Sequence, residues 1–122
     1  MATRRPRRVY EVGDEPDARF TLANERTLLS WLRTALALVV AGVAIVALAE
    51  LITPAWLADV TAVLAFAGGA TTAVLGYVQW QRVERALRRA EPLPAGVGAM
   101  VVIATILAVA VVGVIALLDL VG

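Results

Sequence analysis

Three long apolar stretches, separated by short polar segments, dominate the pattern of residues along this chain. Residues 34–49, 60–81 and 96–118 contain no charged side chain. The hydrocarbon core of a bilayer is about 30 Å thick, and a helix needs about 20 residues to cross it. Runs this long and without alternation favour helices over barrel strands. The pattern predicts three membrane-spanning helices, over about 28–52, 60–81 and 96–118.

The first of these helices is the least straightforward. At about 1.5 Å per residue, residues 34–49 reach only about 24 Å, so this span must take residues from one of its ends. Leu28 and Leu32 are apolar, whereas Glu50 and Pro54 follow at the other end. Extending the span to Leu28 places Arg33 roughly one and a half turns inside the membrane. Because charged groups at such depth usually face protein or water, we expect Arg33 to form an ion pair or to act in function.

The distribution of arginine predicts the orientation of the helices. All the basic residues are arginine, and they concentrate in the first 33 residues and in residues 82–89, whereas the loop 50–59 has none. Cytoplasmic segments collect positive charge. We therefore predict an all-α integral membrane three-helix bundle at residues 19–122, with its N-terminus in the cytoplasm and its C-terminus outside. Residues 1–18, which contain Pro6, Gly13 and Pro16, read as a flexible cytoplasmic arm.

Composition argues against several classes of function. The chain has no cysteine and no histidine, so disulfides, thiolate metal sites and the commonest general base are excluded. No Ser/His/Asp arrangement, phosphate-cradling glycine loop or metal-ligand spacing is present, and Ser30, Thr27 and Thr34 have no base beside them. We expect no enzyme, no metal, no cofactor and no nucleic-acid partner.

Three arginines near the start of the first span share one helix face. Arg19, Arg26 and Arg33 are spaced by seven residues, which corresponds to about 700° of helical rotation. A row of cations at the cytoplasmic mouth is what an anion-binding or pore-lining face would need. The alternative is that these side chains reach lipid headgroups and only anchor the helix.

Other polar residues near the cytoplasmic ends of the helices complete the predicted site. Glu25 is expected to pair with Arg33 of a neighbouring helix, or with Arg82 or Arg85. Thr21 and Asn24 are plausible N-caps for a helix that begins at the membrane surface. The last group is expected to contact anionic lipid or another anion at the inner surface, and it comprises Arg82, Arg85, Arg88 and Arg89.

One long run carries a family resemblance. The sequence RFTLANERTLLSWLRTALAL at residues 19–38 resembles the signature of the YidH-like family of small bacterial membrane proteins, known as domain of unknown function 202. The later YVQWQRVERAL at 77–87 and PLP at 92–94 resemble the end of the family's second helix and its loop. The resemblance implies three transmembrane helices in a bacterial plasma membrane, without a settled activity for most members.

The same motif is also similar to the membrane domain of the yeast vacuolar transporter chaperone complex. That complex makes polyphosphate and passes it through a ring of five three-helix domains lined by basic residues of the first helix. The resemblance would assign pore lining to Arg26 and Arg33, with Glu25 as their pairing partner. This chain has no polyphosphate-synthesising domain, so any polyanion would come from another protein.

Two hypotheses follow for function. In the first, the protein is a homo-oligomer, a pentamer by analogy, that forms an anion pore or translocation domain for phosphate or polyphosphate. In the second, it is a structural or regulatory membrane module that transports nothing and binds anionic lipid or a partner membrane protein. Oligomerisation is expected in both, because three helices with short loops cannot shelter Arg33 and Glu25 from lipid.

Overall fold

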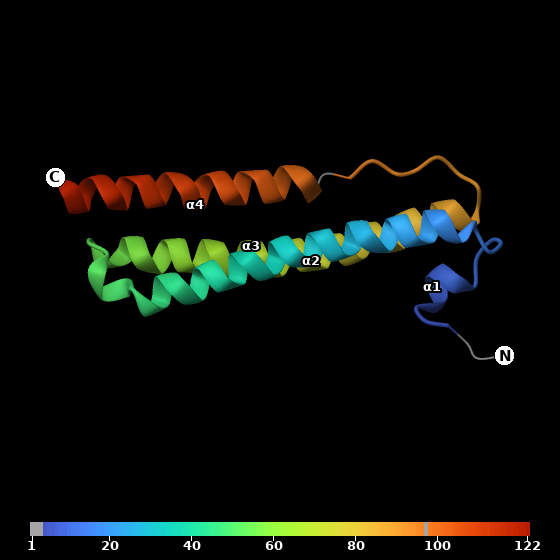
Figure 1. Ribbon diagram of the computed structural model, residues 1–122, viewed down its shortest axis with the longest axis horizontal. Coiled ribbons are helices and arrows are strands. Elements are labelled where there is room, and N and C mark those ends of the chain that lie inside the picture. The colour runs from blue at the N-terminus through green and yellow to red at the C-terminus, as the bar shows by residue number, and fades with distance from the viewer. Residues whose placement is uncertain (1–3, 97) are drawn as a thin grey trace.

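The computed structural model describes residues 4–96 and 98–122, and helices make up most of these ranges. Its elements are α1 (Arg7–Tyr10), α2 (Ala18–Ala47), the 3-10 turn η1 (Ala49–Leu51), α3 (Ala55–Arg88) and α4 (Gly98–Val121). The three long helices are long and apolar enough to cross a membrane. They run side by side, with α1 at the opposite end of the molecule from the C-terminus of α4 (Figure 1). The predicted all-α membrane bundle is confirmed.

Small residues on α3 allow α2 to pack closely against it. A Cβ atom added at Gly69 would lie 2.8 Å from Val39 Cγ2 and 2.9 Å from the Ala35 carbonyl oxygen. Since lipid supplies no hydrophobic drive for helices to associate, close packing of this kind holds membrane helices together. The small residues of α3 that its partner helices bury along residues 58–76 are Ala58, Thr61, Ala62, Ala65, Gly68, Gly69, Thr72 and Gly76.

The last helix, α4, packs on α3 rather than on α2. Gly68 of α3 faces Thr105 of α4, and a Cβ at Gly68 would collide with the Thr105 methyl group. At the far end, the Thr53 hydroxyl donates to the Asp119 carboxylate over 3.4 Å. Most of the α4 surface is exposed and apolar, as expected for a helix that faces lipid or another membrane helix.

The level of the membrane follows from the contacts of Trp31. Its side chain lies against Gly76 of α3 and against Gly98, the first residue of α4. The uncharged part of α4, residues 98–118, is about 31 Å long, which matches the hydrocarbon thickness of about 30 Å. If α4 crosses the bilayer from Gly98, one boundary of the hydrocarbon layer lies at the level of Trp31. Arg33 would then lie about half a turn inside that boundary, and the depth of one and a half turns expected from the sequence stays a prediction.

The helices extend farther on one side of this boundary than the predicted spans did. α2 begins at Ala18 and α3 continues to Arg88, so their paired ends extend beyond the predicted spans, and this part is here called the basic end. At the other side α2 stops at Ala47, before the predicted end at Ile52, because η1 and Pro54 turn the chain. α4 begins at Gly98 rather than at Gly96, and position 97 lies outside the described residues.

The arm that the sequence predicted to be flexible is packed against the basic end. Its residues 1–3 lie outside the described residues, whereas the chain from Arg4 to Asp17 folds back along α3. Val9 of α1 is fully buried, and the Tyr10 ring meets the Trp80 ring edge-on at 6.5 Å between centroids. The side chains of Val9 and Tyr10, together with hydrogen bonds from Arg88 of α3, hold the arm in place.

Candidate functional site

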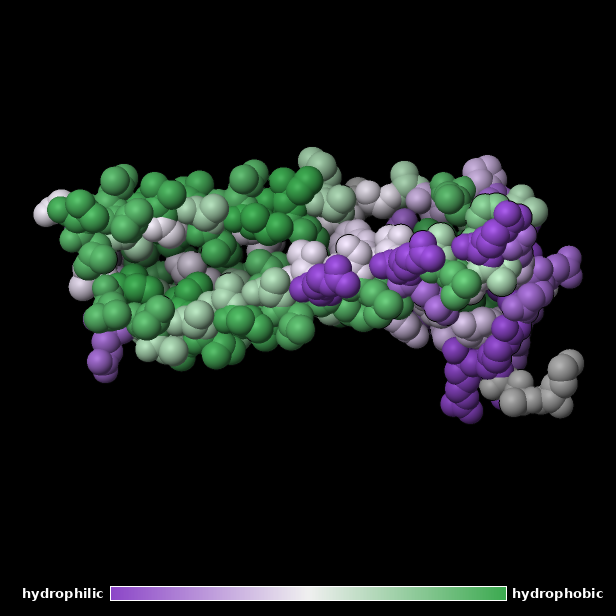
Figure 2. Space-filling model, in the orientation of Figure 1, coloured by the Kyte–Doolittle hydropathy of each residue, from purple (hydrophilic) through white to green (hydrophobic). Residues whose placement is uncertain are grey.

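The arginine row, defined as Arg19, Arg26 and Arg33, lies on the outer face of α2. The α2 residues turned toward α3 alternate in steps of three and four, and they include Asn24, Leu28, Trp31, Ala35 and Leu38. At about 100° per residue, the arginine row points about 160° away from that face. Figure 2 shows hydrophilic side chains in a line over the start of α2, ending where the surface becomes apolar.

The arginine row is exposed, and two of its members have no carboxylate partner. Arg19 pairs with Asp17, the N-cap of α2, at 3.0 Å, and this contact lowers the pKa of Asp17. Within residues 4–96 and 98–122, neither Arg26 nor Arg33 lies within 4.0 Å of a carboxylate, and Glu25 is likewise exposed without an arginine partner. The pairing of Glu25 with Arg33 of a neighbouring helix therefore stays a prediction, and it would have to form between two copies of the chain.

The arginines at the end of α3 separate into two groups. Arg82, Arg85 and Arg89 fall within about 60° of one another around the helix. They line a hollow of about 270 Å³, here called the arginine pocket, which the loop after α3 closes with Glu91, Pro92 and Pro94. An anion could be held there by several guanidinium groups at once. From the sequence, Arg88 was predicted to bind lipid or an anion together with these three arginines. In the structure its side chain contacts the N-terminal arm instead.

Arg88 binds the N-terminal arm. Its side chain, only 6% exposed, donates to the carbonyl oxygens of Val12 (2.8 Å) and Tyr10 (3.0 Å) and to the Glu15 carboxylate (3.2 Å). The Asp14 amide donates in return to the Arg88 carbonyl oxygen over 2.8 Å. In this arrangement Arg88 holds the arm instead of facing lipid or an anion as predicted.

Glu15 lies between two arginines at this contact. Its carboxylate accepts hydrogen bonds from Arg4 and from Arg88. These contacts, with Arg4 the larger, lower the pKa of Glu15 to about 2. The Arg4 guanidinium also lies 4.6 Å from the centroid of the Tyr10 ring, a cation–π arrangement. Charge-assisted hydrogen bonds therefore hold the N-terminal arm on α3. The Arg4 and Glu15 side chains that take part in them are exposed to solvent.

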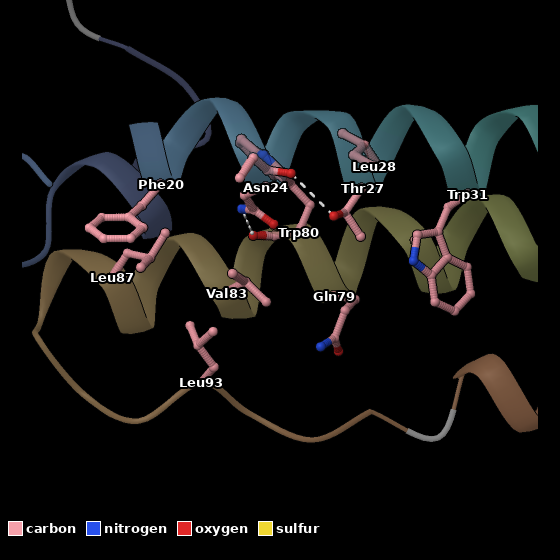
Figure 3. Close-up of a pocket in the computed structure, with 12 residues that line it drawn as sticks. Phe20, Asn24, Thr27, Leu28, Trp31, Gln79, Trp80, Val83, Leu87 and Leu93 are labelled. Atoms are coloured by element: carbon pink, nitrogen blue, oxygen red, sulfur yellow. Dashed lines mark hydrogen bonds between the residues drawn. The ribbon is translucent and has the colours of Figure 1, made fainter. Parts of the chain in front are cut away.

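A buried polar cluster joins α2 to α3 at the basic end. Glu84 is only 1% exposed, and it accepts from the Thr21 hydroxyl (3.0 Å) and from the Asn24 amide (3.3 Å). The Asn24 amide also donates to the Trp80 carbonyl oxygen over 3.1 Å (Figure 3). A buried polar group is costly unless it is hydrogen-bonded, so this cluster specifies how the two helices are paired.

The buried polar cluster differs from the sequence prediction in two ways: in the roles of Thr21 and Asn24, and in the presence of Glu84. Thr21 and Asn24 were expected as N-caps, but α2 begins at Ala18 and Asp17 caps it by accepting from the Arg19 amide over 2.9 Å. Glu84 was not singled out from the sequence. Its position four residues after Trp80, on a helix otherwise rich in arginine there, gives only a weak signal, because acidic side chains near helix ends are usually exposed.

No potential metal site is evident in the ranges that the structure covers, since no three acidic side chains gather there. The family model described as Domain of unknown function (DUF202) matches residues 19–86, more than half of the chain. The chain belongs to the DUF202 family. The match contains the arginine row, the buried cluster and most of the α2–α3 hairpin.

Curated relatives of this DUF202 protein support the same assignment. It is 48% identical over 80 residues to an uncharacterized protein of Mycobacterium tuberculosis, an alignment that covers 66% of each chain, just under two thirds. It is 43% identical over 89 residues to the inner membrane protein YidH of Escherichia coli K12, which covers 71% of this chain and 76% of YidH. A YidH protein of Shigella flexneri matches equally well. No solved structure matches the chain significantly.

These relatives and the three long apolar helices together define where the protein resides. YidH is named an inner membrane protein, and the DUF202 protein described here has three helices able to cross a bilayer. It is therefore a multi-pass protein of the cell membrane.

Proposed function

We propose that this protein forms a homo-oligomer in which the arginine row of each copy lines the entrance to an anion path. The permeant anion would be phosphate or polyphosphate, and no catalysis by this chain is involved. The observation that carries the proposal is the position of the row. Arg26 and Arg33 are exposed on the face of α2 opposite α3, without carboxylate partners in the described ranges.

The path would have to lie between copies rather than inside one. Within a copy, the α2–α3 contact is closed by small residues, and Gly69 and Gly76 leave no room for an added methyl group. The arginine row faces away from that contact, so α2 helices of several copies would have to surround a common axis. A ring of guanidinium groups would then concentrate a polyanion at the basic end. Five copies is the number suggested by the resemblance to the yeast complex.

A second function is favoured by the level of Arg33. Because Arg33 lies close to the membrane boundary, its long side chain can reach lipid headgroups by running along the helix surface. The protein would then be a module that transports nothing and binds anionic lipid or a partner membrane protein. In that case the arginine row anchors α2, and its removal changes membrane binding without changing ion flux.

Flux measurements separate these two functions. We expect purified protein in liposomes to conduct radiolabelled phosphate or short-chain polyphosphate, and Arg26→Gln with Arg33→Gln to lower that flux about tenfold, because the charged mouth is removed. Arg5→Gln with Arg8→Gln removes the same charge from two exposed arginines of the arm and is the matched control. Unchanged flux in the Arg26→Gln, Arg33→Gln variant, or a monomer in mild detergent, would overturn the anion path.

A further inference from the structure

The two helices that flank α3 leave a groove between them. α2 and α4 contact α3 but do not pack along each other, apart from the contact of Trp31 with Gly98. Between them lies a hollow of about 210 Å³ at the level of the membrane boundary. It is lined by Ser30, Trp31, Thr34, Ala99, Val102 and Ile103.

This hollow continues into the basic end. A neighbouring hollow of about 320 Å³ shares Trp31 and Ala99 with it, and it reaches Arg82. Arg82 in turn lines the arginine pocket. In Figure 3 the Trp31 ring and the Gln79 amide point from their helices toward the segment that leads to α4. The three hollows therefore follow one another from a set of arginines to an apolar cleft between membrane helices.

The order of these surfaces matches the parts of a phospholipid. Trp31 marks the boundary, and Arg82 lies six residues beyond Gly76 on α3, about 9 Å farther out. From there its long side chain can reach back to the phosphates of the headgroup layer, which is about 5–7 Å thick. Arg85 and Arg89 continue the cationic surface outward. Glu91 also lines the arginine pocket, and its carboxylate can accept from a headgroup hydroxyl but would repel a second phosphate.

We infer that one anionic phospholipid with a hydroxyl-bearing headgroup, of the phosphatidylglycerol type, binds along this groove. Its phosphate contacts Arg82 and Arg85, its headgroup enters the arginine pocket beside Glu91, and one acyl chain passes Trp31 to lie between α2 and α4. The lipid thus fills a cleft that α2 and α4 leave open. This site is separate from the arginine row on the outer face of α2, so it stands or falls independently of the proposed anion path.

Quenching of Trp31 by brominated lipid tests the inference. The variant Trp56→Phe with Trp80→Phe leaves Trp31 as the single tryptophan, and circular dichroism checks that it stays helical. In phosphatidylcholine vesicles we expect a small fraction of brominated phosphatidylglycerol to bind on the order of tenfold better than the same fraction of brominated phosphatidylcholine. Native mass spectrometry of the unaltered chain provides a second measurement, since one phosphatidylglycerol should stay bound.

Two sets of variants locate the lipid. Arg82→Gln with Arg85→Gln and Arg89→Gln should abolish the preference, whereas Arg5→Gln with Arg7→Gln and Arg8→Gln removes the same charge from the arm and should not. Ala99→Leu should fill the apolar hollow and reduce quenching severalfold. Equal quenching by both lipids, a preference that survives the first triple variant, or no effect of Ala99→Leu would overturn the inference. So would loss of the preference on adding millimolar inorganic phosphate, which would assign the arginine pocket to free anion.

Discussion

The arginines of this protein differ in what surrounds them, and this difference decides what each can do. The spacing by seven correctly predicted that Arg19, Arg26 and Arg33 share a face, because α2 continues unbroken back to Ala18. Sequence alone could not separate Arg88 from its neighbours. The residues that bind Arg88 lie more than 70 positions earlier, in a segment whose proline and glycine content predicted flexibility.

The buried cluster was beyond prediction for a similar reason. Glu84 is buried by Thr21 and Asn24, whose contacts with it span about 60 residues of sequence. Periodicity identifies which residues share a face of one helix, but it does not say which residue of another helix meets them. Threonine, asparagine and glutamate are also common on solvated surfaces, so their identities alone did not indicate that they are buried.

Because Glu15 is hydrogen-bonded to Arg4 and Arg88, the docking of the arm on α3 is expected to depend on pH. The folded pKa of Glu15 is depressed to about 2, below its ordinary value of 4.5. Its contribution is therefore complete above about pH 4.5 and is lost as the pH falls toward 2. We expect the methyl NMR signals of Val9 to be constant from pH 8 to pH 5 and to shift toward unfolded values below pH 4.5.

Glu15→Gln serves as the matched variant for that titration. The amide keeps the shape of the side chain but removes its charge, so the arm should be partly undocked already at pH 7 and should show no step near pH 4. A Val9 signal that shifts identically in Glu15→Gln and in the unaltered chain would show that another group controls the arm.

At the scale of the helices, α3 organises the molecule. It contacts α1, α2 and α4, and small residues let both long partners approach it. The uncharged stretches predicted that three helices exist and roughly where they cross the membrane. They could not predict the helix ends at the basic end, because α2 and α3 continue as a packed pair beyond the uncharged stretches, where hydropathy no longer distinguishes helix from loop.

Glycines that look alike in sequence should respond differently to substitution. Gly69→Ala would place its methyl group against Val39 and Ala35, and such overpacking costs about 1–3 kcal/mol. Gly113 has no atom within 4 Å of an added Cβ, so Gly113→Ala should be neutral, or stabilising by up to about 1 kcal/mol through helix propensity. Thermal unfolding in one detergent, followed by circular dichroism, measures both. Equal effects of the two substitutions would contradict the α2–α3 packing.

At the scale of the whole molecule, charge is separated between the two ends. The arginines lie on the arm, at the basic end and, with Arg33, just beyond it, while Glu50, Asp59 and Asp119 lie near the other ends of the long helices. This separation was readable from the sequence, since it needs only the order of charged and apolar segments. Contacts between copies could not be predicted from the sequence, because an exposed apolar helix face in a membrane can contact either lipid or another protein.

The orientation that this separation predicts can be measured directly. The chain has no cysteine, so a single introduced thiol reports on its own position. In spheroplasts, an impermeant maleimide should label Gly122→Cys from outside, and it should label Arg5→Cys only after permeabilisation. The reverse pattern would place the basic end, and with it the arginine row and the arginine pocket, on the outer side of the membrane.

The packing of α4 mainly on α3 has a consequence for how the protein is made. Segments are synthesised and released in order, and earlier units fold first. α2 and α3 bury their shared face, including the Asn24–Glu84 contact, without any help from α4. The hairpin can therefore complete its packing in the membrane while α4 is still being translated. The last helix then joins a finished template, so defects in α4 leave an inserted hairpin rather than an unfolded chain.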